Sequence, residues 1–288
     1  MRALLIAAAA TLIAGTAPAC ASPTELWQTS GLKHPESALP DPTGTFAYVS
    51  NVNGDALAKD GNGFISKISL ADGKIIELEW AKGLDAPKGL ALANGRLYAS
   101  DIDKLVEIDA NSGKILARYD APGSKFLNDD AAGPDGTVYV SDSSTSTIWR
   151  FKDGKLEKWL EGEALKYPNG LHVSGDKLII AAWGAPGTSG TNPAPANLLE
   201  VSLADKSVRD LGDGKPIGNL DGLEPYDATS YLVTDWVAGG LYRIDVSGKA
   251  DLLLKLNQGS ADIGYVPEQR LLLIPMMLDN KLIAYRLE

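Results

Sequence analysis

The feature that most constrains the fold is a short motif that returns along the chain with one variable position. Its clearest copy is Tyr-Pro-Asn-Gly-Leu at residues 167–171, and Ala-Pro-Lys-Gly-Leu at 86–90 and Leu-Asp-Gly-Leu at 220–223 repeat its frame. We call the variable position the slot. Looser copies bring the slots to Glu36, Lys88, Asn128, Asn169, Asp221 and Asp262. Their spacing of roughly 40 to 50 residues is typical of stacked supersecondary units.

The residues after each slot indicate the structure of one unit. A turn follows, and then a run rich in β-branched and aromatic residues, as at 45–49 and 137–141. An alternating third run comes next, as at 147–151, and several units end with a fourth run after an Asp-Gly or similar turn, as at 155–159. Four antiparallel strands in each of six units predict an all-β protein, a six-bladed β-propeller.

The last unit lacks one strand. It shows runs only at 263–266, 270–274 and 281–287, and the given sequence then stops. Residues 24–28 precede the first slot and belong to no unit of their own. Pairing them beside the last run would leave neither edge exposed. We therefore predict that an N-terminal strand completes the last blade and closes the ring.

The N-terminus has the character of a secretory signal. Residues 3–19 are mainly apolar and Ala-rich behind Arg2, and Ala-Pro-Ala at 17–19 offers small residues for cleavage. The apolar stretch is too short for a membrane span, so we predict a signal peptide at 1–21, one propeller domain at 22–288, and a periplasmic or secreted protein. Cys20 is the only cysteine. A lipid anchor there is the less favoured alternative, because the preceding residues match a lipoprotein motif poorly.

The charge balance limits the class of partner. The chain has 27 Lys and Arg against 37 Asp and Glu, a net charge of −10. This excess repels nucleic-acid phosphates and anionic lipid, and no basic aromatic stripe offsets it. We therefore expect a small-molecule ligand, no nucleic acid, and a monomer.

The slots form the candidate site, because the first strand of each propeller blade lines the central channel. Six slots would then point into one mouth, with three carboxylates, two amides and one lysine. Such hard oxygen ligands suit calcium or magnesium. Without Cys ligands or a His pair, a structural zinc site is disfavoured. The alternative is that the polar residues hydrogen-bond one another, with Lys88 neutralising the carboxylates.

Four slots carry a resemblance to a known family. Glu36 in His-Pro-Glu, Asn128 in Leu-Asn-Asp, Asn169 in Pro-Asn-Gly-Leu and Asp221 in Asp-Gly-Leu resemble, in order and at blade spacing, the gluconolactonase/regucalcin family of six-bladed propellers. The resemblance implies that Glu36, Asn169 and Asp221 bind one divalent cation, Ca²⁺ first, with Mg²⁺, Mn²⁺ and Zn²⁺ as alternatives. It also implies that Asn128 faces the substrate or the reacting water, and that Asp221 is the acid/base.

Two departures concern specificity. Phe126 stands where sugar-lactone members of that family usually carry Arg, and Asp-Asp at 129–130 stands where they carry Asp-Gly. These departures leave specificity for sugar lactones open, even with the metal site intact.

Other features are expected to border the same opening. Trp183 and Trp236 end second strands, where they either form an apolar wall or pack between blades. The links at 51–63 and 183–195 are unusually long, and they either form a partial lid or are tolerated surface insertions.

Together these patterns predict a divalent-metal-dependent hydrolase of lactones or related esters. Asp221 and Asn128 would be catalytic, and Asn128, Trp183 and Lys88 would contact the substrate. The alternative is a non-catalytic propeller that binds a small ligand or a protein partner, with a structural metal. Oxygen ligands that hold calcium structurally can also activate water, so the sequence leaves both open.

Overall fold

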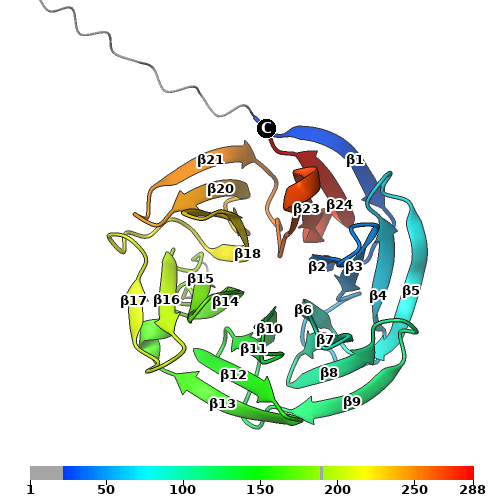
Figure 1. The fold of residues 1–288 in the computed structure, drawn as a ribbon, viewed down its shortest axis with the longest axis horizontal. Coiled ribbons are helices and arrows are strands. Elements are labelled where there is room, and N and C mark those ends of the chain that lie inside the picture. The colour runs from blue at the N-terminus through cyan, green and yellow to red at the C-terminus, as the bar shows by residue number, and fades with distance from the viewer. Residues whose placement is uncertain (1–21, 189–190) are drawn as a thin grey trace, which may run out of the picture.

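The fold is a ring of six four-stranded antiparallel sheets, as Figure 1 shows. The computed structural model describes residues 22–188 and 191–288. The signal peptide predicted at residues 1–21, with Cys20, lies outside the described residues. The all-β, six-bladed propeller predicted from the repeat is confirmed.

The blades follow one another in chain order. Blade 1 contains β2 (Pro35–Pro40), β3 (Phe46–Asn51), β4 (Gly63–Ser69) and β5 (Ile75–Leu84). Blade 2 contains β6 (Pro87–Ala93), β7 (Arg96–Asp101), β8 (Lys104–Asp109) and β9 (Ile115–Asp120). Blade 3 contains β10 (Leu127–Ala132), β11 (Val138–Asp142), β12 (Thr147–Lys152) and β13 (Lys155–Glu161). Blade 4 contains β14 (Pro168–Ser174), β15 (Lys177–Ala182), β16 (Leu198–Ser202) and β17 (Val208–Asp210).

The last two blades complete the ring. Blade 5 contains β18 (Leu220–Asp227), β19 (Ser230–Asp235), β20 (Gly240–Asp245) and β21 (Ala250–Lys255). Blade 6 contains β22 (Gly264–Val266), β23 (Leu271–Met276), β24 (Lys281–Arg286) and, from the other end of the chain, β1 (Thr24–Ser30). Three short 3-10 turns are η1 (Glu163–Leu165), η2 (Pro267–Gln269) and η3 (Met277–Asp279). Among the described residues, no helix has the length and apolar character that a membrane crossing requires.

Burial follows from position in the ring. The first strand of each blade lies innermost and the fourth outermost (Figure 1). Most residues of the innermost strand β10 are buried, whereas the outermost strand β9 alternates between partly buried and exposed side chains. This alternation reflects the two faces of a strand, only one of which packs against its neighbours. Apolar clusters between adjacent blades form the core, such as the one that joins Leu32 and Val49 to Leu273.

Tight turns connect the strands. The β6–β7 hairpin turns at Asn94 and Gly95, with φ of 51° and 73°, and the β12–β13 hairpin turns at Asp153 and Gly154, with φ of 51° and 77°. Two successive positive φ angles match the twist of a two-residue hairpin, which favours Asn-Gly and Asp-Gly pairs.

The ring closes as the sequence predicted. β1 pairs antiparallel with β24, from Thr24 opposite Arg286 to Ser30 opposite Lys281. The strand also contacts blade 1, because Trp27 Nε1 donates to Leu70 O at 3.2 Å. Both ends of the chain therefore hold the last blade together.

Candidate functional site

A β-bulge lies at the slot in blades 1 to 5. In blade 4, Pro168 pairs with Ala182 but Leu171 pairs with Ile180, so the first strand has one residue more than its partner. The same shift lies between Pro35 and Ala38, Pro87 and Leu90, Leu127 and Asp130, and Leu220 and Leu223. A bulge re-aims the side chains of the residues it contains. The bulge therefore explains why the slot side chain leaves the sheet.

Buried hydroxyl groups satisfy the backbone amides that the bulges remove from the sheet ladder. Ser141 Oγ accepts from Asp129 N at 2.9 Å, and Thr234 Oγ1 accepts from Gly222 N at 2.8 Å. In blade 1, Ser50 Oγ accepts from the residue after the slot in the same way. An unpaired buried amide would cost about 1–3 kcal/mol, so these hydroxyls stabilise the bulged conformation.

A glycine follows several slots because the backbone of the next blade lies too close to leave room for a side chain. A Cβ atom on Gly170 would lie 2.0 Å from the backbone oxygen of Asp221, and one on Gly89 would lie 2.4 Å from Asp129 Cα. Innermost strands of adjacent blades therefore touch backbone to backbone at the level of the bulge. This contact brings slots from different blades together.

Five of the six slots line one cavity of about 340 Å³, which we call the mouth cavity. They are Glu36, Lys88, Asn128, Asn169 and Asp221, each buried. The structure thus places every candidate metal ligand, catalytic residue and substrate contact named from the sequence around the same space, including Trp183.

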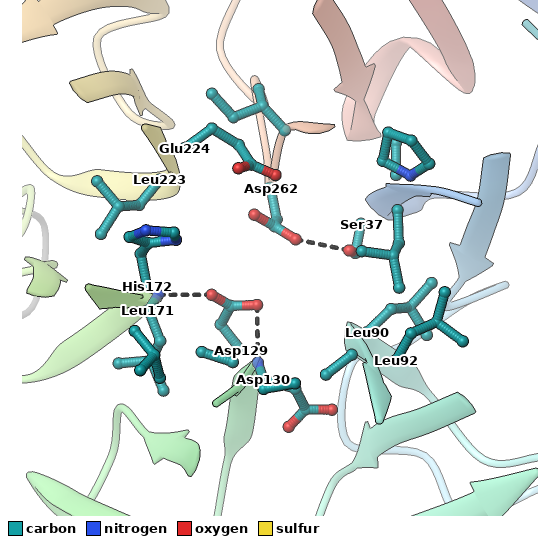
Figure 2. Close-up of a pocket in the computed structure, with 18 of the residues that line it drawn as sticks. Ser37, Leu90, Leu92, Asp129, Asp130, Leu171, His172, Leu223, Glu224 and Asp262 are labelled. Carbon is teal, nitrogen blue, oxygen red and sulfur yellow. Dashed lines mark hydrogen bonds between the residues drawn. The ribbon is translucent and has the colours of Figure 1, made fainter. Parts of the chain in front are cut away.

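The prediction that Asp262 is the sixth slot is wrong. Asp262 lines a second cavity of about 270 Å³, the rear cavity (Figure 2). Ser260 bridges to Met276 and Gly264 pairs with Leu273. This register places the slot at residue 261 and Asp262 one position later. Its Oδ2 accepts from Ser37 Oγ at 2.5 Å. Because a shift of one residue turns a side chain to the other side, Asp262 leaves the mouth.

Buried oxygens without partners converge on the mouth cavity. Glu36 Oε2, Asn128 Oδ1 and Asp221 Oδ1 are buried and have no hydrogen-bond partner among the described residues. Such groups are destabilising unless a ligand satisfies them. Asn169 Nδ2 also lacks a partner. A half-turn of that amide exchanges nitrogen for oxygen with almost no change in shape, so this position suits an oxygen ligand as well.

The two carboxylates of the mouth cavity resist ionisation. Burial raises the pKa of Glu36 well above its usual range, the charges of Asp221 and Asp262 raise it further, and Lys88 lowers it. Burial, and then the charge of Asp262, raise the pKa of Asp221 well above its usual range. A cation between the two carboxylates would reverse this effect and release protons.

The ligand set depends on amides as well as on carboxylates. Within residues 22–188 and 191–288, no three His, Cys, Asp or Glu side chains group closely enough to hold a metal ion. A cation in the mouth cavity would therefore need Asn169 in addition to Glu36 and Asp221. Carboxylate and amide oxygens together form a donor set that calcium accepts.

Ser143 orients Asn128, and the sequence did not predict it. The Ser143 hydroxyl donates to Pro168 O at 2.7 Å and accepts from Asn128 Nδ2 at 3.1 Å. The amide oxygen of Asn128 is thereby left for the cavity. The only sequence signal is that Ser143 follows the Ser-Asp pair at the end of a second strand, which does not distinguish it from other turn residues.

Apolar side chains form much of the cavity wall. The rings of Trp183 and Trp236 lie 6.0 Å apart between centroids and both line the cavity, as does Met277. Ala56 and Pro186 also line it, so both long links reach the opening as expected.

The first long link is anchored to blade 2. Lys59 Nζ lies 2.5 Å from Asp103 Oδ2, and Gly61 N donates to Asp85 Oδ1 at 3.1 Å. These contacts hold the first link against blade 2, and the partial lid stays a prediction.

The rear cavity collects a second group of acids. Asp129, Asp130, Glu224 and Asp262 line it, and Figure 2 shows them around the axis of the ring. Asp129 accepts from Leu171 N at 2.6 Å and from Asp130 N at 2.8 Å. Burial raises the pKa of Asp262 from 3.8 to about 7, and burial together with Asp262 raises the pKa of Glu224 to about 8.

These raised values predict that stability falls as the pH rises. Asp262 keeps its proton in the folded chain but loses it in the unfolded chain from about pH 4 upward. The free energy of unfolding should therefore decrease between about pH 4 and pH 8, by about 4 kcal/mol for Asp262. Urea denaturation in the presence of chelator measures this decrease. Asp262→Asn should flatten the profile and the exposed-turn variant Asp153→Asn should not, whereas equal slopes in all three proteins would contradict the assignment.

Comparison with known proteins supports the fold. No protein-family model matches the chain. A gluconolactonase from Xanthomonas campestris superposes with a TM-score of 0.67 at 14% identity, covering 93% of this chain and 96% of that one. The calcium-binding protein regucalcin from Agrobacterium tumefaciens gives 0.65 at 15%, covering 93% and 94%. Virginiamycin B lyase from Staphylococcus aureus gives 0.65 at 15%, covering 92% and 99%.

At these identities the likeness establishes the shared propeller fold alone. The neighbours include a gluconolactonase, a calcium-binding protein and a lyase. A single fold can carry several chemistries, so function must be argued from the site.

Proposed function

We propose that the mouth cavity binds one divalent cation, Ca²⁺ in the first place, through Glu36, Asn169 and Asp221, and that it hydrolyses a lactone or related ester. The observation that carries this proposal is the set of buried, unpartnered oxygens of Glu36, Asp221 and Asn128 around one cavity. Two carboxylates offset the charge of a divalent cation, and amide oxygens fill further positions. Its place would be the periplasm or the cell exterior, in keeping with the signal expected at residues 1–21.

The cation would supply a Lewis acid that polarises an ester carbonyl and lowers the pKa of water. The chain supplies the rest of the chemistry. Asp221 takes or relays the proton of the attacking water, because its buried carboxylate lines the cavity that the substrate would enter. Asn128 orients the substrate through its amide oxygen, which Ser143 turns toward the cavity.

The wall of the cavity favours substrates with an apolar body. Trp183, Trp236 and Met277 offer large contact areas but few hydrogen-bonding groups. A polyol would leave several hydroxyls unsatisfied against such a wall. We therefore expect alkyl- or aryl-substituted lactones and aryl esters to be better substrates than sugar lactones.

The test is turnover of five- and six-membered lactones and aryl esters with and without chelator. Chelation should abolish hydrolysis and added calcium should restore it, because no other group in the proposed set polarises the carbonyl. Asp221→Asn should be inactive even with saturating calcium. The matched variant Asp262→Asn, in the rear cavity, should retain turnover.

The alternative is a binding protein with a structural cation. Absence of metal-dependent turnover across the panel, together with unaltered ligand binding by Asp221→Asn, would favour that alternative over the hydrolase.

A further inference from the structure

Lys88 is a buried cation with a free donor. It is only 2% exposed, yet it is one of the residues that line the mouth cavity. Nζ donates to the backbone oxygens of Ala56 and Ala86, both at 3.0 Å. An ammonium group has three donors. The third has no hydrogen-bond acceptor among the described residues.

The position of this ammonium is fixed before any ligand arrives. Nζ lies 4.5 Å from the centre of the Phe126 ring, within the range of a cation–π contact. Ala56 belongs to the first long link, which the Lys59–Asp103 pair anchors. A donor held by two carbonyls and a ring needs little reordering on binding, so it can contribute to affinity at low entropic cost.

The charge of Lys88 is not neutralised at close range. Across residues 22–188 and 191–288, no carboxylate lies within 4 Å of Nζ. The acids that act on it from further away are Glu36, Asp101 and Asp55. Asp101 is engaged elsewhere, since its carboxylate accepts from Asp85 N at 2.9 Å and from Ala86 N at 2.7 Å.

With a divalent cation bound, the charge balance of the mouth cavity would be positive. The cation would offset the charges of Glu36 and Asp221, and Lys88 would add a positive charge that no other slot residue compensates. Burial lowers the pKa of Lys88 to about 8, which still leaves most of it protonated at neutral pH. A buried charge is costly unless it is paired, so an anionic ligand would be favoured at this point.

We propose that the substrate of the mouth cavity carries a carboxylate that pairs with Lys88, in addition to the ester bond and an apolar body. This inference rests on the hydrolase function proposed above. It names the substrate class as anionic lactones or esters, with the carboxylate at Lys88 and the apolar part against Trp183 and Trp236.

The first experiment compares a matched pair of lactones on the calcium-loaded protein. The pair is 5-oxotetrahydrofuran-2-carboxylate and its neutral carboxamide, which has almost the same shape. The carboxylate should have a KM at least about tenfold lower, because it alone pairs with the buried ammonium. Lys88→Met should remove this preference and Lys88→Arg should retain part of it.

A remote lysine provides the control variant. Lys206 also lies over an aromatic ring, 5.5 Å from the centre of Trp159, and also donates to a backbone oxygen, but it lies outside the mouth cavity. Lys206→Met should leave the preference for the carboxylate unchanged.

A second readout requires no turnover. Calorimetry with phenylacetate and phenylacetamide on the same calcium-loaded protein should show at least about tenfold tighter binding of the anion, and Lys88→Met should abolish the difference. Preference for phenylacetate without hydrolysis of any lactone would reject the proposed function and keep only the anion site at Lys88.

The opposite results overturn the inference. If the carboxylate and the carboxamide are hydrolysed with equal KM, the pairing with Lys88 is rejected and the hydrolase function is kept. A Lys88→Met variant that loses kcat equally on both lactones at unchanged KM would also reject this pairing, because Lys88 would then act on the reacting oxygen. Absence of both turnover and anion preference would reject both proposals.

Discussion

Calcium should bind the Asp221→Asn variant at least about a hundredfold more weakly than the parent protein. Asp221 supplies one of only two carboxylates in the mouth cavity, and its Oδ1 is buried without a partner among the described residues. The amide keeps the shape of the side chain but removes its charge. Glu36 would then be the only carboxylate beside the divalent cation, so one of the two negative charges that offset the cation would be missing. Titration calorimetry at fixed pH measures the change in Kd.

Asp262→Asn is the matched control for this measurement. It is the same substitution in the same kind of residue, but in the rear cavity, one position beyond the slot of blade 6. Its calcium affinity should stay within a few-fold of the parent value. A parental Kd in Asp221→Asn, with a parental melting curve, would show that the cation, if any, lies elsewhere.

Deleting residues 22–30 should lower the free energy of unfolding by several kcal/mol. The deletion removes β1, whose pairing with β24 completes blade 6, and it exposes the edge of that blade. It also removes the Trp27 Nε1 bond to Leu70 O and the Thr29 Oγ1 bond to Gly73 O, at 3.2 and 2.5 Å. Urea denaturation followed by tryptophan fluorescence gives the midpoint and the slope.

A milder variant keeps this test decisive if the truncated chain fails to fold. Trp27→Ala retains the strand but removes the side chain that packs on the hairpin at Gly73. Truncation of a half-buried aromatic residue should cost about 2–3 kcal/mol. A denaturation midpoint unchanged in both variants would mean that β1 does not contribute to closing the ring.

The fold could be predicted because its signals are local and repeated. Pro or Leu before the slot, and Gly after it, mark a bulge where two innermost strands touch, and the same frame returns in successive blades. The N-terminal strand of blade 6 could be predicted because the last unit has three strand-like runs where the other units have four. Neither step required knowledge of contacts between distant side chains.

The errors arose where that frame is absent. Blade 6 has Ser-Ala-Asp-Ile-Gly at residues 260–264, without the Pro or Leu that precedes the slot in the other five blades, so the sequence predicts the slot at Asp262 instead of residue 261. The anchoring of the first long link depends on Lys59 and Asp103, which lie far apart in sequence. Ser143 acquires its role only through Pro168 and Asn128 in neighbouring strands.

At the bulges, the groups that stabilise the backbone differ from the side chains that line the mouth cavity. Buried hydroxyls such as Ser141 and Thr234 satisfy the backbone at the bulge, and they do so whichever side chain occupies the slot. In blades 1, 3 and 5 the slot side chain can therefore change without loss of the hydrogen bond that holds the bulge. Substitutions at these three slots offer a route to new ligands, in which selection alters the chemistry of the mouth one blade at a time.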